Sequence, residues 1–331
     1  MDDFWRSRAG LPASRGVLAA QPGDPALATA PPGATPSPDA PIRMTRLPPS
    51  AKLAELVRHY WIPRWRLPAG HSVTQRVLEY PSANLVVEGG AVAVHGPSIG
   101  LGRRTLTGEG RAFGVLLQPG TANALLGADA RSLVGRALPL RESPRHAHPP
   151  AVVAVAAMHD AVQRELQHDD SGADLRAVTV FEHWLTGLDL TLDDDARFVR
   201  ELVTRAEEDR TIVRVQQLAS LAGVGVRQLE RIVREQLGLT PKWLIRRYRL
   251  QEAAERLAAS DRPSLAGLAT ELGYADQAHF TREFAAVIGV PPGRYVREAG
   301  ARTAAMGSGP ADASGAPDAA GAPDAASGGH S

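Results

Sequence analysis

An internal repeat of about 50 residues in the C-terminal third of the chain constrains its fold more than any other sequence feature. In each copy an alanine is followed four residues later by a glycine, then by an amphipathic segment, and finally by a second glycine and a proline. The paired positions are Ala219 and Ala269, Gly223 and Gly273, Gly238 and Gly289, and Pro241 and Pro292. The repeat therefore predicts two copies of one small helical unit.

Each copy has the pattern of a helix-turn-helix. A small residue in the first helix, Ala219 or Ala269, allows the second helix to cross close above it, and the turn glycine permits the positive φ of a sharp reversal. In the second helix of the first copy, Leu229, Ile232 and Val233 are expected to face the core. The outward side chains can then enter the major groove of DNA, as this motif requires.

Polar side chains on the outward faces of the two second helices, predicted near residues 226–237 and 277–288, are the candidate base-reading groups. Paired donors on arginine suit guanine O6 and N7, and glutamine suits adenine N6 and N7. A solvated helix face would explain one outward arginine, but equivalent arginines on both helices favour DNA binding. The candidates are Arg227, Arg231, Gln277, His279 and Arg282.

A continuous helix is predicted between the two copies, because Lys242 to Ala259 has helical periodicity without glycine or proline. Its 18 residues span about 27 Å at about 1.5 Å per residue, near the roughly 34 Å between successive major-groove faces. A mismatch would require either a bend in the duplex or weak docking of one helix, and both alternatives stay open. Lys242, Arg246 and Arg247, at the start of this helix, are the candidate phosphate contacts.

The charge of the repeat region agrees with a DNA-binding role. The whole chain has 331 residues and a net charge of only +1. Residues 211–298 contain 13 basic and nine acidic residues, so the basic surplus lies in the segment that carries the predicted reading helices. Basic side chains supply the sequence-independent attraction to the phosphate backbone.

At these residues the chain resembles the AraC/XylS family of bacterial transcription regulators. The matching text is Gly238-Leu239-Thr240-Pro241, Leu268-Ala269, the run from Leu272 to Phe284, and Gly289-Val290-Pro291-Pro292 with Tyr295. The resemblance covers about a third of the chain. It implies a DNA-binding region with two helix-turn-helices joined by a long helix, and it places the five candidate base-reading residues where family members touch bases.

Two residues of the first copy depart from the family pattern. Gly225 stands where a Ser or Thr helix cap is common, and Val233 stands where Phe is common. Glycine offers no side-chain oxygen to the first backbone N–H groups of a helix. These departures predict a less well capped first reading helix and a weaker grip of the first copy on DNA.

The segment ahead of the repeat predicts a small β domain. Lys52 to Trp61 has helical spacing, and short strand-like pieces with glycine and proline punctuation follow from residue 73 to residue 117, which favours an antiparallel sheet or barrel. This part resembles, more weakly, the sensor-type β domain of one subgroup of the family, which implies effector binding or dimerisation. Trp61, Tyr80 and Phe113 either line a ligand pocket or form the core.

No metal or other cofactor is expected. His71 and His95 lie in the β region without the clustered His-x-His and Glu spacing of a metal-binding barrel, and His146 and His148 lie in a proline-flanked segment typical of an exposed loop. The chain has no cysteine, which excludes disulfides, thiolate zinc sites and cysteine nucleophiles. It also excludes the thiol-dependent relatives that the resemblance suggests, and we expect no enzymatic activity.

These patterns together predict an α+β multidomain protein. A small β-barrel-like domain with flanking helices precedes an all-α domain of two helix-turn-helix subdomains joined by a long helix. The predicted divisions are a disordered arm at 1–48, a β-rich sensor or dimerisation domain at 49–142, a helical connector at 143–191, the double helix-turn-helix domain at 192–298, and a disordered tail at 299–331.

The sequence predicts a sequence-specific DNA-binding regulator of transcription, and activation is among its expected roles. Expected partners are a double-stranded DNA operator, RNA polymerase, a small-molecule effector of unknown identity, and a second copy of the chain. The alternative is a ligand-independent regulator whose β domain only dimerises. The longest apolar stretch, Ala151 to Met158, falls short of the roughly 18 residues of a membrane span, so we expect a cytoplasmic protein without a membrane partner.

Overall fold

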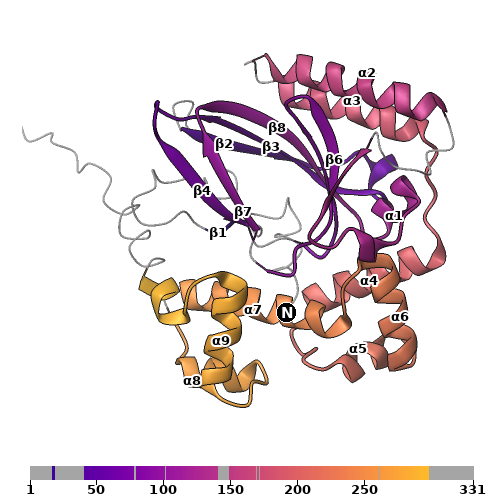
Figure 1. Cartoon of the computed structure of the whole chain (residues 1–331). Coiled ribbons are helices and arrows are strands. Elements are labelled where there is room, and N and C mark those ends of the chain that lie inside the picture. Colours follow the sequence, from indigo (N-terminus) through magenta and orange to yellow (C-terminus); the bar gives the residue numbers. More distant parts are fainter. Residues whose placement is uncertain are drawn as a thin grey trace, which may run out of the picture.

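The computed structural model describes residues 17–18, 41–77, 80–100, 102–140, 149–168, 170, 172–259 and 261–297. A β-rich region is followed by a helical region (Figure 1). The predicted tail at 299–331 lies outside the described residues, and so does most of the predicted arm at 1–48. Across the described residues no helix is long and apolar enough to cross a membrane.

The strands of the described residues form two antiparallel sheets (Figure 1). The larger sheet has the order β2-β3-β8-β5-β6-β9, and the smaller has the order β1-β4-β7. The bounds are β1 (Val17–Leu18), β2 (Ile42–Leu47), β3 (Val57–Arg66), β4 (Ser72–Val77), β5 (Asn84–Glu88), β6 (Ala91–His95), β7 (Gly102–Thr107), β8 (Glu109–Leu117) and β9 (Ala137–Pro139). The predicted single barrel is not confirmed, because the described strands belong to two sheets.

Two local predictions at the start of the β domain are wrong. Strand β2 lies inside the predicted arm, where it pairs with β3 along its whole length and buries Ile42. The helical spacing of Lys52 to Trp61 yields only a short 3-10 helix, η1 (Ala51–Leu53), before β3 begins at Val57. In both places pairing with a distant strand decides the conformation and overrides the local pattern.

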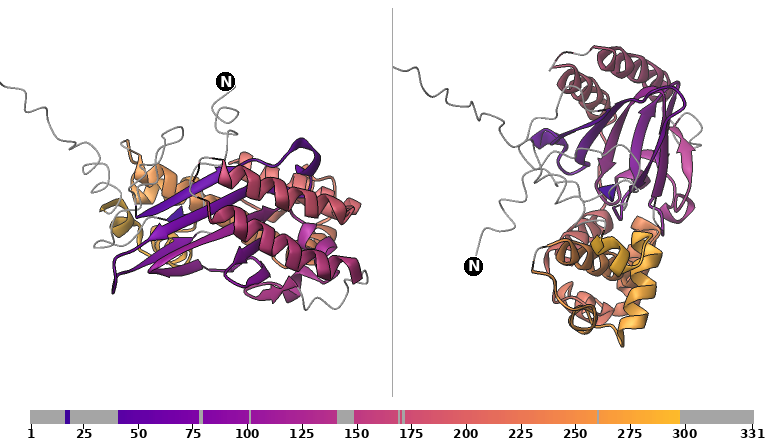
Figure 2. Two further views of the ribbon diagram at one scale, coloured as in Figure 1. Left: turned by 90° about the horizontal axis from the view of Figure 1, so that it is seen from above. Right: turned by 90° about the vertical axis from the view of Figure 1, so that its left-hand side faces the viewer.

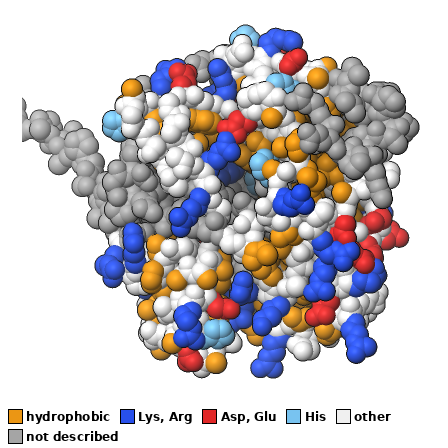
Figure 3. Space-filling view, in the orientation of Figure 1, with side chains coloured by type: hydrophobic (Ala, Val, Ile, Leu, Met, Phe, Trp, Pro, Cys, Tyr) orange, Lys and Arg blue, Asp and Glu red, His pale blue; other side chains and the backbone are white. Residues whose placement is uncertain are grey.

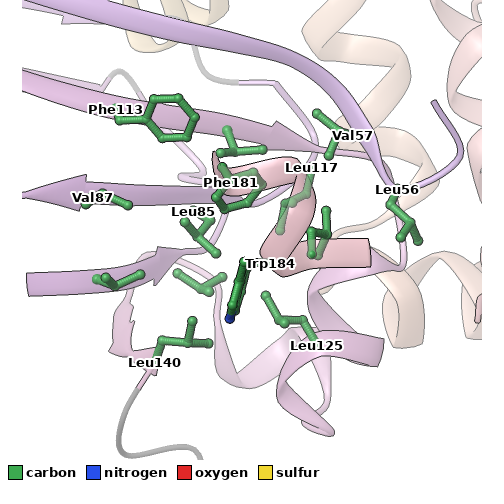
Figure 4. Close-up of a cluster of buried hydrophobic side chains, with 14 of the residues drawn as sticks. Leu56, Val57, Leu85, Val87, Phe113, Leu117, Leu125, Leu140, Phe181 and Trp184 are labelled. Atoms are coloured by element: carbon green, nitrogen blue, oxygen red, sulfur yellow. The ribbon is translucent and has the colours of Figure 1, made fainter. Parts of the chain in front are cut away.

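Helices α2 (Pro149–Leu166) and α3 (Ala173–Gly187) lie side by side across one face of the larger sheet (Figure 2). They complete its core, in which the ring centroids of Phe113 and Phe181 are 5.5 Å apart and those of Phe181 and Trp184 are 5.3 Å apart (Figure 4). The helical pair predicted as a separate connector is therefore part of the β-rich domain. A short helix, α1 (Thr121–Leu126), and a 3-10 helix, η2 (Ala130–Ser132), follow β8.

The described part of the helical region contains six helices in sequence order. They are α4 (Asp194–Glu208), α5 (Val215–Leu221), α6 (Val226–Leu237), α7 (Pro241–Ala258), α8 (Leu265–Glu271) and α9 (Gln277–Ile288). The predicted helices near 226–237 and 277–288 and the predicted connecting helix are confirmed by α6, α9 and α7. The start of α7 is fixed by Thr240, whose side-chain oxygen accepts from the Trp243 N–H at 3.1 Å, and by proline in the first turn.

Two hydrophobic clusters stabilise the helical region, and α7 contributes to both. The first cluster joins α4, α5 and α6 to the N-terminal half of α7, with Val233 and Leu244 fully buried. The second joins α8 and α9 to the C-terminal half of α7, with Phe280 and Phe284 fully buried. Each helix-turn-helix thus has its own core, and α7 holds the two at a fixed separation.

Candidate nucleic-acid interface

The two turns between paired helices have the same geometry. Gly223, between α5 and α6, has a φ of 67°, and Gly273, between α8 and α9, has a φ of 71°. In each turn the residue after the glycine donates its N–H to the carbonyl oxygen of the buried alanine, at 3.1 Å in the first copy and 2.9 Å in the second. These bonds close a helix C-terminus in the manner of a Schellman motif. The two copies therefore share one turn geometry between their paired helices.

The starts of the two reading helices differ, as the sequence predicts. Asp276 caps α9, with its carboxylate accepting from the His279 N–H at 2.7 Å. Gly225 is the N-cap of α6, and no side chain accepts a hydrogen bond there. The prediction of a less well capped first helix is confirmed. Side-chain capping stabilises the first turn of α9 but not that of α6.

In the first copy, both predicted base-reading residues are exposed on α6. Arg227 lies in the first turn, at the end of the helix that enters a groove in this motif. Arg231 lies one turn later, where its Nη1 is 2.5 Å from Glu235 Oε2 and its Nη2 is 3.6 Å from Asp195 Oδ2. The acidic partners of Arg231 were not anticipated from the sequence.

In the second copy, Gln277 and Arg282 are exposed on α9, and His279 is partly exposed beside them. The His279 Nε2 is 3.7 Å from Glu283 Oε1, and its ring stands edge-on to Tyr274 with centroids 5.3 Å apart. Gln277 is exposed because it begins the helix, whereas His279 and Arg282 lie on the side of α9 away from the buried Phe280 and Phe284.

The three predicted phosphate contacts on α7 differ in how far their side chains are exposed to solvent. Lys242 is exposed, and Arg246 is half-buried with its Nη1 3.4 Å from Glu283 Oε1. Arg247 is only 2% exposed, donates to Gln251 Oε1 at 2.9 Å and has its guanidinium carbon 6.0 Å from the Tyr80 ring of the β domain. A phosphate contact from Arg247 is incompatible with this placement, because on α7 it lies on the face that packs against the β domain.

Basic side chains are distributed over the helical part of the molecule in the view of Figure 3, with acidic side chains between them. This mixed distribution agrees with the modest basic surplus in the sequence. Affinity for DNA would then depend on a few placed arginines and lysines more than on a broad positive field.

The aromatic candidates of the β domain are not brought together in one pocket. Phe113 belongs to the core, and Tyr80 is buried at the junction with the helical region. Trp61 is partly buried, and its indole N–H donates to Asn84 Oδ1 at 3.0 Å. Because successive strand residues alternate in direction, Trp61 faces away from the Tyr60 and Phe113 side of the sheet that α2 and α3 cover.

The described residues contain no group of three or more His, Asp or Glu side chains that could hold a metal ion. His71 is exposed and His95 lies partly buried in β6. His146 and His148 lie outside the described residues.

The junction between the β domain and the helical region is held by contacts that sequence reasoning missed. The Arg58 Nη2 of β3 is 2.7 Å from the Glu207 Oε2 of α4, and the Arg58 guanidinium carbon lies 4.7 Å from the Tyr80 ring centroid. Burial is the largest single influence on Arg58 and would lower its pKa, but the charge and hydrogen bond of Glu207, together with Tyr80 and Tyr248, outweigh burial and the pKa is raised. No local pattern marks this pair, since its members are 149 residues apart.

His59, next to Arg58 on β3, is 5% exposed, and its Nδ1 has no hydrogen-bond partner among the residues that the structure describes. Burial, together with the positive charges of Arg46 and Arg58, lowers the pKa of His59 to about 3. The unfolded chain takes up this proton below its usual pKa of about 6.5, whereas the folded chain does so only near pH 3. The unfolded state therefore binds more protons across this window, and stability falls as the pH falls through it.

We expect His59 to lower the free energy of unfolding by about 2 kcal/mol between pH 7 and pH 5, since each pKa unit corresponds to about 1.4 kcal/mol. Urea unfolding of the full chain at several pH values measures this loss. His59→Gln should flatten the pH dependence, whereas His71→Gln, at an exposed histidine, should leave it unchanged. Equal pH profiles for wild type and His59→Gln would contradict the expectation.

Comparison with known proteins supports the assignment of the C-terminal region. A family model described as a helix-turn-helix domain matches residues 218–298, and a domain of unknown function, DUF6597, matches residues 45–139. An uncharacterised HTH-type transcriptional regulator of Haemophilus influenzae is 31% identical over 101 residues, which are 30% of this chain and 34% of that protein. The chain therefore spans about a third of the length of this curated relative.

Two solved structures illustrate the similarity of the chain to known folds. The C-terminal domain of AraT, a response regulator from Geobacillus stearothermophilus, is 24% identical, with a TM-score of 0.29 over 32% of this chain and 88% of that chain. ToxT from Vibrio cholerae is 12% identical, with a TM-score of 0.33 over 77% of this chain and 97% of that chain.

Proposed function

Residues 218–298 form an AraC-type helix-turn-helix domain, and from this premise we propose that the chain is a transcription regulator that reads two neighbouring major-groove segments of DNA. The observation that carries the proposal is the equivalence of α6 and α9. Each follows the same glycine turn, packs on its own core and exposes an arginine at the same point of the repeat. Both lie at the end of the molecule away from α2 and α3 (Figure 1).

In the proposed complex, base contacts come from the exposed faces of α6 and α9. Arg227 and Arg231 act in the first half-site, and Gln277, His279 and Arg282 act in the second. Lys242 and Arg246, near the start of α7, contact the phosphate backbone between them. Arg247 is omitted, because it is buried against the β domain.

The length of α7 bears on the shape of the bound DNA. Its 18 residues span about 27 Å at about 1.5 Å per residue, which is shorter than the roughly 34 Å between equivalent major-groove faces. A straight duplex therefore matches the two reading helices imperfectly. Either the duplex bends toward the protein or one helix docks weakly, and the uncapped α6 is the helix expected to dock weakly.

The β domain is proposed to regulate this DNA-binding domain, either by binding a small effector or by pairing two copies of the chain. Trp61 and Asn84 support an effector site, since they offer an aromatic surface and an amide on the sheet face away from the helical core. Thermal stabilisation of the full chain by a metabolite would favour the effector, and a concentration-dependent dimer without such stabilisation would favour pairing alone. No enzymatic step is part of the proposal.

We expect Arg231→Ala and Arg282→Ala each to weaken binding to a specific site by about 1–3 kcal/mol and to relax the base preference at one position. A duplex enriched by the wild-type chain from a randomised pool serves as the probe, and binding is measured by competition at fixed salt. Arg103→Ala, which removes one exposed arginine from β7, is the control and should change neither quantity. If specific and non-specific binding weaken equally, the two arginines contact phosphates only.

A further inference from the structure

The C-terminal half of α6 is held from two sides by α4 and the β domain, whereas its N-terminal half packs on its own helix-turn-helix core through Leu229. On one side lies the start of α4, with its acidic segment Asp193–Asp195. On the other side lies the β domain, where η2 packs against the end of α6 and Gly238 lies against Ala130 and Val134. The first reading helix is thus part of the junction between the two domains.

Arg231 is the side chain most directly affected by this arrangement. Its guanidinium is paired with Glu235 on α6 at 2.5 Å and with Asp195 on α4 at 3.6 Å. Asp195 is 40% exposed and Arg231 is 53% exposed, so the pair lies at the surface, where an approaching duplex can compete for the guanidinium. The donors that would bind a guanine edge are therefore engaged by carboxylates in the DNA-free protein.

The neighbouring residue Gln236 ties the same segment to both domains. Its Nε2 donates to Asp193 Oδ1 at 3.3 Å, and its Oε1 accepts from the Asn123 Nδ2 of α1 at 3.3 Å. The same Asn123 amide donates to the Glu235 carbonyl oxygen at 2.9 Å. Asn123 therefore satisfies a carbonyl near the end of α6, and the start of α4, the end of α6 and the β domain share one hydrogen-bonded network.

The equivalent arginine of the second copy lacks this restraint. Arg282 is exposed on α9 and, within the described part of the chain, forms no ion pair. The two reading helices thus differ in how readily their arginines can reach a base. The missing side-chain cap on α6 acts in the same direction, because both features are expected to weaken DNA binding at the first half-site.

We propose that Asp195 restrains the first reading helix by holding the Arg231 guanidinium, so that DNA must displace this carboxylate before Arg231 can contact a base. The inference rests on the proposed DNA-binding function. Asp195 is a positioning residue that acts through Arg231. Asn123 and Asp193 hold α4 and α6 in place, which gives the β domain a direct hydrogen-bonded connection to the first reading helix.

The test compares Asp195→Asn with Asp194→Asn. Both substitutions remove one negative charge from the first turn of α4, but Asp194 is fully exposed and pairs with Arg197 of its own helix at 3.1 Å. We expect Asp195→Asn to tighten binding to the enriched duplex by about two- to fivefold, the range of a surface ion pair. Asp194→Asn should change binding by less than this, because it leaves the contact between Asp195 and Arg231 intact.

A double-mutant cycle with Arg231→Ala then separates the pairing from general charge effects. In the Arg231→Ala background, Asp195→Asn should have no more effect than Asp194→Asn. Equal effects of the two asparagine variants, or a gain from Asp195→Asn that persists without Arg231, would overturn the inference and leave the proposed function intact. Failure of the wild-type chain to enrich any sequence would instead overturn the proposed function, and the inference with it.

Discussion

Replacing Phe280 with alanine is expected to lower the free energy of unfolding of the second helix-turn-helix by about 3–5 kcal/mol, the usual cost of removing a buried phenylalanine ring. Phe280 is 0% exposed, and its ring centroid is 5.4 Å from that of Tyr274 and 5.6 Å from that of Phe284. A cavity at this point removes contacts from α8, α9 and the end of α7 together. Hydrogen exchange of the α8 and α9 amides in the full chain measures the loss.

The Phe280→Ala variant should also lose binding to the second half-site of its DNA while keeping binding to the first. The reason is that the two units have separate buried clusters, each completed by one half of α7. Val233→Ala, at a fully buried position of the first cluster, is the matched control and should raise exchange in α5 and α6 instead. If either variant opened both units equally, the two units would form one cooperative core and the expectation would be wrong.

The helical region was predicted well because its determinants are local in sequence. Gly223 and Gly273 mark positive-φ turns, and Gly238 and Gly289 adopt a left-handed conformation at the ends of α6 and α9. Each of these requirements acts within a few residues. A second copy of the same pattern 50 residues later made chance agreement implausible, so even the exposed faces of α6 and α9 could be assigned before the structure.

The β domain was predicted less well because its strands depend on distant partners. Strand β2 is short and lies between prolines, and only its pairing with β3 reveals it as part of the sheet. The segment after Lys52 has helical spacing, but β3 pairs with β8 more than 40 residues away. Periodicity in a single sequence carries no information about such pairing.

The error at Arg247 has a related cause. A basic cluster at a helix start looks like a phosphate site when the helix is considered alone. In the folded chain α7 presents Lys242 to solvent and Arg247 to the β domain. Which face a helix buries depends on the domain that packs against it, and the Asp195 contact with Arg231 was hidden for the same reason.

Loss of the Arg58–Glu207 ion pair should also lower the free energy of unfolding substantially. Glu207 is 9% exposed and Arg58 is 24% exposed at the side chain, so Glu207→Gln leaves a largely buried guanidinium without its carboxylate. Breaking one side of a buried pair costs about 3–5 kcal/mol, and the partial exposure of Arg58 places the expected loss near about 2–3 kcal/mol. Urea unfolding of the full chain measures it, and exchange should rise in β3 and α4, where the two domains meet.

Glu201→Gln is the control for this prediction, because Glu201 is an exposed glutamate of the same helix. It removes the same charge from α4 and should change stability by less than about 0.5 kcal/mol. If Glu207→Gln changed the free energy of unfolding as little as Glu201→Gln, the Arg58–Glu207 ion pair would not stabilise the junction between the domains. If instead Glu207→Gln destabilises the chain and Asp195→Asn still tightens DNA binding, then separate contacts fasten α4 to the β domain and restrain the first reading helix.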